Sequence, residues 1–239
     1  MAPPARAPTQ PTMTPPPSPR PHRLRTALFL LGLIPALRLA VGVRTGGLGA
    51  DPVATITATT GLWSLNLLFA SLAITPLHRL TGWHGLVRAR RMLGLFAFFY
   101  ACLHGAAYLV FEQFFDWAGM LADIAKRPFL AAGGLGFALM LPLAATSTDG
   151  MVRRLGGRSW RRLHRLAYLC ALVAVLHYLW LVKRDITLPG LYALALCALL
   201  AARMARPRRS HGPARSRSIP RKPAPLHIGT DENTGQGDQ

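Results

Sequence analysis

The sequence predicts an all-α membrane protein built as a bundle of six transmembrane helices. Of its 239 residues 51% are hydrophobic, yet the formal net charge is +19. The apolar residues are gathered into long blocks, and the basic residues lie between and after these blocks. A block of about 20 apolar residues is long enough to cross a bilayer as a helix. Nucleic-acid-binding domains instead display their arginines on a folded polar surface, so the pattern argues against that class.

Six blocks have the length and composition of membrane spans. The expected spans are residues 24–43, 58–77, 92–111, 129–146, 163–182 and 188–202, of which the last is the shortest. Pro35 and Pro142 should kink the first and fourth helices, which neighbouring helices tolerate in a membrane. We expect three parts: a disordered Pro-rich extension at 1–22, the bundle at 23–205 and a disordered basic tail at 206–239.

The distribution of Lys and Arg predicts the orientation of the bundle. The connection 78–91 carries four arginines, the connection 147–162 carries five, and the segment after residue 202 is rich in Lys and Arg. The remaining connections hold fewer basic residues, mixed with Asp and Glu. Basic connections stay on the cytoplasmic side, so both termini should face the cytoplasm.

Three histidines fall within the expected spans: His104 in the third, and His164 and His177 in the fifth. Ionisable side chains at membrane depth usually face a bundle interior or a functional site. The third and fifth spans run in the same direction, and His104 and His177 should lie about 18–21 Å along them. Both imidazoles are therefore expected level with each other, toward the outer leaflet.

Two imidazoles at matched depth on two helices are what a six-coordinate haem requires, because its iron needs one axial ligand from each face. The sequence thus predicts a haem between the third and fifth helices, ligated by His104 and His177. The segment Gly105, Ala106 and Ala107 would leave room for the macrocycle, and no CxxCH motif is present, so the haem should be held non-covalently. Tyr100 and Tyr108 should share the helical face of His104. The alternative for each histidine is a neutral imidazole bonded to a neighbouring helix.

His164 precedes His177 by about 20 Å along a helix and should lie some 140° from it around the axis. Either the fifth helix is distorted or His164 faces something else. No histidine near Arg91 matches the depth of His164, so one haem is expected rather than two. A pocket at the cytoplasmic edge would suit an anion such as a flavin phosphate, or a quinone headgroup, although its arginines could equally face lipid phosphates. Its members would be Arg90, Arg91, Arg161, Arg162 and His164.

The three cysteines, Cys102, Cys170 and Cys197, all lie in apolar blocks without a pairing pattern. Their spacing matches neither a metal site nor a disulfide framework. We expect all three to be small buried hydrophobic residues.

Four segments carry a resemblance to a known family: "PALRLAVG" at 35–42, "RARRMLGLFAFFYACLHGAAYL" at 88–109, "DIAKRPFLAAGGLGFALMLPLAATS" at 123–147 and "SWRRLHRLAYLCALVAVLHYLWLVKRD" at 159–185. Over roughly residues 24–205 the chain resembles the MsrQ (YedZ) family of the ferric-reductase-like transmembrane group. These proteins are haem-binding subunits of the bacterial periplasmic methionine sulfoxide reductase system. The family's histidines fall on His104, His164 and His177, which leaves His164 open as a third candidate ligand of the haem iron.

The resemblance implies a multi-pass inner-membrane protein with haem b, and with FMN near Arg90 and Arg91. It also implies electrons drawn from the quinone pool or a flavin reductase and passed to a periplasmic molybdenum-containing catalytic subunit. That subunit would reduce methionine sulfoxide in oxidised proteins. The sequence itself offers no Cys, Ser or carboxylate constellation for that reduction, so this chain should only transfer electrons.

Two other functions fit the same pattern. A ferric-reductase-like protein could serve another acceptor, although such proteins often carry a nicotinamide domain and no GxGxxG motif follows a strand here. A transporter or assembly factor with structural histidines is the alternative from another class. Transporters more often bury acidic residues within broken helices, whereas Asp and Glu here lie in the expected connections and tail.

Overall fold

The structure, a computed structural model, describes residues 21–82, 85–182 and 184–204, and every element in these ranges is helical. The elements are α1 (Pro21–Thr45), α2 (Pro52–Thr81), α3 (Gly85–Ala107), the π-helical turn η1 (Tyr108–Glu112), α4 (Trp117–Lys126), α5 (Pro128–Ala145), α6 (Asp149–Leu163), α7 (Leu166–Leu181) and α8 (Thr187–Met204). The two tails expected to be disordered lie outside the described residues, except that residues 21 and 22 begin α1.

The six expected spans correspond to α1, α2, α3 with η1, α5, α7 and α8. Five of these, all but α7, are individually long and apolar enough to cross a membrane. The 16-residue α7 reaches that length only together with α6, from which it is bent by 44°. The protein is therefore a multi-pass, all-helical membrane protein with five to six candidate spans.

Two short helices, α4 and α6, occupy connections in which the sequence analysis placed no element. Asp116 caps α4 by accepting a hydrogen bond from the Gly119 N–H (3.0 Å), and Thr148 caps α6 by accepting from the Met151 N–H (3.3 Å). Both helices mix apolar and charged residues and are too short to span. A search for long apolar blocks therefore passes over them.

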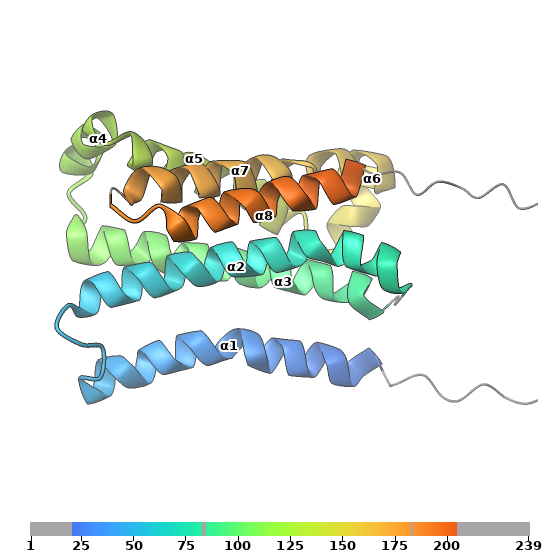
Figure 1. The fold of residues 1–239 in the computed structure, drawn as a ribbon, viewed down its shortest axis with the longest axis horizontal. Helices are drawn as coiled ribbons and strands as arrows, with labels where there is room; N and C mark the ends of the chain where they lie inside the picture. The colour runs from blue at the N-terminus through green and yellow to red at the C-terminus, as the bar shows by residue number, and fades with distance from the viewer. Residues whose placement is uncertain (1–20, 83–84, 183, 205–239) are drawn as a thin grey trace, which may run out of the picture. The chain divides into compact units, whose positions relative to one another are not determined.

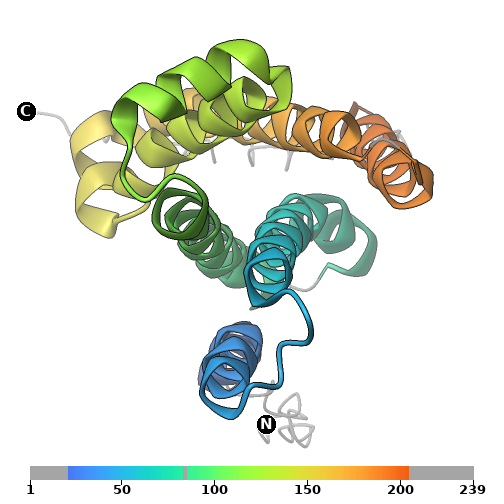
Figure 2. The ribbon, with the colours of Figure 1, turned by 90° about the vertical axis from the view of Figure 1, so that its left-hand side faces the viewer.

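Helices α2 and α3 form the centre of the bundle, with α1 on one side and α5, α7 and α8 on the other (Figures 1 and 2). Buried side chains of α2, α3 and α7, such as Leu68, Ala97 and Ala171, make up the core between these layers. Helix α1 begins and α8 ends at the same end of the bundle, which also carries α6, while α4 lies at the opposite end (Figure 1).

The hydroxyl of Tyr100 on α3 joins α1 to the core by entering the hydrogen-bond ladder of α1. It donates to the Gly32 carbonyl (2.7 Å) and accepts from the Ala36 N–H (3.0 Å), two groups that would otherwise bond each other. A Cβ on Gly32 would come within 3.0 Å of the Phe96 ring, so glycine permits this close packing. The insertion falls at Pro35, where the ladder already lacks one N–H.

The three cysteines are all free, but they differ in burial. Cys170 is buried, Cys102 is half-buried and Cys197 is exposed on α8. The expectation of burial was therefore wrong for Cys197, because α8 packs on α7 and α2 by its opposite side and turns this residue outward.

A candidate metal centre between two histidines

The structure brings His104 on α3 and His177 on α7 together within the bundle. Their ring centres lie 6.2 Å apart and their planes are inclined by 81°. The matched depth expected from the sequence accounts for this proximity. Both residues lie near the ends of their helices that point toward α4 (Figure 1).

Each imidazole is fixed through its Nδ1 atom by a main-chain carbonyl of an adjacent helix. His104 Nδ1 lies 2.9 Å from the Thr57 carbonyl oxygen of α2, and His177 Nδ1 lies 2.6 Å from the Phe129 carbonyl oxygen of α5. A carbonyl oxygen can only accept, so each Nδ1 carries the proton and donates it. Each Nε2 then keeps a free lone pair, which is the arrangement of a metal-binding histidine with its outer hydrogen bond.

A glycine lies one helical turn after each accepting carbonyl. Gly61 follows Thr57 by four residues, and Gly133 follows Phe129 by four residues. A Cβ on Gly61 would come within 3.0 Å of His104 Nδ1, and one on Gly133 within 3.0 Å of His177 Cε1. Each ring therefore packs against one turn of a neighbouring helix. The carbonyl at position i of that turn binds the ring, and the glycine at i+4 leaves space for it.

This arrangement fits a haem. An imidazole nitrogen binds a first-row metal at about 2 Å and lies about 1 Å from its own ring centre, so two axial imidazoles should have centres about 6 Å apart. The observed ring separation is 6.2 Å. Residues 21–82, 85–182 and 184–204 contain no group of three or more His, Cys, Asp and Glu able to hold a metal ion. A haem iron takes four nitrogens from its porphyrin, so two imidazoles would complete its coordination.

His164 lies apart from this pair, at the break between α6 and α7. Its Nδ1 lies 3.2 Å from the Trp160 carbonyl oxygen, its Nε2 lies 3.4 Å from Ser147 Oγ, and its ring stacks on Trp160 at 3.9 Å. Both alternatives from the sequence hold, since the fifth helix is broken here and His164 faces the end of α5. Trp160 also joins α6 to the end of α5 by donating from Nε1 to the Thr146 carbonyl (2.9 Å).

Arg90 and Arg91, adjacent in the sequence, point to different neighbours. Arg91 forms an ion pair with Asp149 at the start of α6. Arg90 is half-buried, and electrostatically it interacts with Tyr168 of α7 and Arg203 of α8. Two members of the expected pocket around His164 thus have different partners. The charges of both arginines still reach His164.

The two tyrosines expected beside His104 have separate roles. Tyr100 is fully buried and turns to α1, and the Tyr108 hydroxyl is buried without a hydrogen-bond partner in the described parts of the chain. Gly61 and Gly133 were not expected at this site. The only signal for Gly133 was its place within the segment 123–147, and nothing in the sequence singled out Gly61.

Fold and site together define a class: a helical, multi-pass membrane protein that brings two half-buried histidines together within its bundle. Residues 57–175, which contain His104 and end two residues before His177, match the model of the family described as "Ferric reductase like transmembrane component".

Comparison with named relatives assigns the chain to one family within this class. The chain is 49% identical over 210 residues to the protein-methionine-sulfoxide reductase heme-binding subunit MsrQ of Azospira oryzae, an alignment that covers 87% of this chain and 90% of that protein. The MsrQ of Ralstonia nicotianae is 49% identical over 81% of this chain and 89% of its own length. That of Xanthomonas axonopodis is 54% identical over 66% and 72%, respectively. The chain belongs to the MsrQ family.

Proposed function

We propose that this protein holds a b-type haem between His104 and His177 and carries electrons across the membrane to a methionine sulfoxide reductase. The single observation that carries the proposal is the pair of imidazoles 6.2 Å apart, each with Nδ1 directed to a main-chain carbonyl. The names of the MsrQ relatives, which describe them as heme-binding, add independent support. Bound haem would supply a one-electron carrier.

The residues around the pair would set the conditions for this carrier. Thr57 and Phe129 hold the imidazoles through their carbonyls, which fixes the orientation of the rings and raises their basicity as ligands. Gly61 and Gly133 let the rings lie against α2 and α5. A haem held here by half-buried imidazoles would be partly shielded from water, which helps to define its potential.

The donor side would be the end of the bundle that carries α6. Arg90 precedes His104 by 14 residues, which is about 21 Å of helix. We place FMN at this end, near Arg90 and Arg91, with a quinone or a flavin reductase as the electron donor. Arg90 fits this part of the proposal better than Arg91, because Asp149 already neutralises Arg91.

The acceptor would be a periplasmic, molybdenum-containing catalytic subunit at the end that carries α4, toward which the histidine pair is displaced (Figure 1). The basic connections support this direction, because they would place α6 and both termini on the cytoplasmic side of a bacterial inner membrane. The relatives are named as subunits of a protein-methionine-sulfoxide reductase, which agrees with such a partner. The reduction of the sulfoxide would belong to that partner, and this chain would supply the electrons.

The visible absorption spectrum of the detergent-purified protein tests the proposal directly. A Soret band that shifts on addition of dithionite, with resolved α and β bands, is expected for a low-spin haem with two histidine ligands. A featureless spectrum from well-folded protein, even after haem is supplied, would mean that the two histidines are structural. It would then favour the alternative of a transporter or assembly factor.

A further inference from the structure

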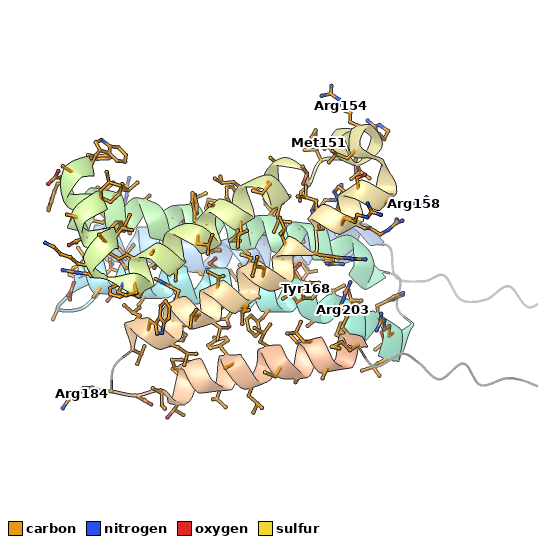
Figure 3. All side chains as sticks on the ribbon, turned by 90° about the horizontal axis from the view of Figure 1, so that it is seen from above. Met151, Arg154, Arg158, Tyr168, Arg184 and Arg203 are labelled. Atoms are coloured by element: carbon orange, nitrogen blue, oxygen red, sulfur yellow. The ribbon has the colours of Figure 1, made fainter. Side chains whose placement is uncertain are left out.

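Two buried hydrogen-bond donors lie without acceptors at the end of the bundle that carries α6. The guanidinium carbon of Arg203 on α8 lies 4.7 Å from the ring centre of Tyr168 on α7 (Figure 3). The Tyr168 hydroxyl and the Arg203 Nη1 atom are both buried, and neither has a hydrogen-bond partner among the described residues. Buried donors are normally satisfied, so this pair indicates that an acceptor belongs there.

The positive charges around this pair also indicate that an acceptor, and specifically an anion, belongs there. Arg90 of α3 interacts electrostatically with both Tyr168 and Arg203. Arg79 of α2 adds a third guanidinium by donating from Nη1 to the Arg203 carbonyl (3.1 Å). Among the described residues, Asp149 pairs with Arg91 and Asp123 pairs with Arg127, and neither pair includes a member of this cluster. Guanidinium groups gathered without a counter-charge favour binding of an anion.

We propose that Arg90, Tyr168 and Arg203 form a binding site for a phosphate group. A guanidinium presents its N–H groups as a planar fork that matches phosphate oxygens, and the tyrosine hydroxyl can donate to a further oxygen. The site joins the ends of α3, α7 and α8, so a bound phosphate would also tie these helices together.

A phosphate can reach this site from two sources. One is the headgroup of an anionic phospholipid, since polar ends of membrane helices lie at headgroup level. The other is FMN, in which case the inference rests on the flavin part of the proposed function. In neither case does it depend on haem, because His104 lies about 21 Å from Arg90 along α3.

The test uses the full-length protein in detergent with two pairs of probes that differ by a phosphate group. The first pair is phosphatidylglycerol and diacylglycerol, and bound lipid is measured by native mass spectrometry. The second pair is FMN and riboflavin, and binding is measured by flavin fluorescence. The phosphate-bearing member of at least one pair should bind about tenfold tighter or more, and that pair identifies the source.

The variants R203Q, Y168F and R184Q complete the experiment. R203Q should weaken binding of the preferred phosphate compound about tenfold, and Y168F should weaken it less while keeping the ring under Arg203. R184Q is the matched control, because Arg184 is exposed at the opposite end of the bundle (Figure 3). An unchanged haem spectrum verifies the fold of each variant. No preference for phosphate in either pair, or equal binding by R203Q and R184Q, would overturn the proposal.

Discussion

The imidazole of His177 lies so close to Gly133 that a Cβ at this position would come within 3.0 Å of His177 Cε1. The same relationship joins His104 to Gly61 on the other side of the site. Each glycine follows the carbonyl that fixes the ring by one helical turn. The two halves of the site are thus built alike from different helix pairs, α2 with α3 and α5 with α7.

This relationship predicts that G133A and G61A impair haem binding. The added methyl group must push the ring away from its carbonyl, at a cost of about 1–3 kcal/mol. Haem content per protein and the reduction potential of the remaining haem are the measurements. G134A is the matched control, because a Cβ at this position meets nothing within 4 Å. If G133A and G134A bind equal amounts of haem with equal reduction potentials, the close contact between Gly133 and His177 does not matter for haem binding.

Loss of either predicted axial ligand should abolish the low-spin spectrum. H104A and H177A each remove one of the two imidazoles, and six-coordinate iron needs both. Haem content and the reduced absorption spectrum of purified protein are the readouts. H164Q should keep the spectrum, because both ring nitrogens of His164 have polar partners outside the pair. Unaltered haem in H104A would refute the ligand assignment.

Removing the Tyr100 hydroxyl should destabilise the packing of α1. Y100F leaves the Ala36 N–H and the Gly32 carbonyl separated by a ring edge, which costs about 1–3 kcal/mol for each group left unpaired. The thermal unfolding midpoint in detergent should fall. Y108F is the control, because it removes a neighbouring tyrosine hydroxyl that bonds neither Gly32 nor Ala36. Equal midpoints for the two variants would contradict this role of Tyr100.

The two neighbouring arginines should differ in their effect on flavin. R90A and R91A are both expected to spare the haem and to weaken flavin or donor binding. The effect should be larger for R90A, since Arg91 is already paired with Asp149. Flavin fluorescence after release from the protein, set against haem absorbance, separates the two cofactors. A flavin content unchanged in both variants would remove FMN from this end of the bundle.

The positive-inside distribution predicts which end of the bundle faces the cytoplasm. Arg158 of α6 and Arg184, which precedes α8, are exposed at opposite ends (Figure 3). Single cysteines would be placed at these positions after replacement of Cys102, Cys170 and Cys197. A membrane-impermeant maleimide added to cells with a permeabilised outer membrane should label R184C and leave R158C unlabelled. The reverse pattern would invert the orientation and the direction of electron flow.

The sequence alone determined the membrane bundle and the histidine pair. Apolar blocks long enough for a bilayer predicted all six long elements, because a span must be apolar along its whole length. The depth of His104 and His177 followed from helical rise, a local quantity that does not depend on packing.

Tertiary structure decided everything that depends on which helix faces which. Only packing brings the Thr57 and Phe129 carbonyls to the imidazoles, and only the resulting contact gives Gly61 and Gly133 a role. Arg90 and Arg91 likewise have different partners because different helices pack beside them. The contact between Tyr168 and Arg203 also joins two different helices. Helical periodicity fixes the direction of a side chain around its own axis, but the rotation of that axis against its neighbours is set by the packing of the whole bundle.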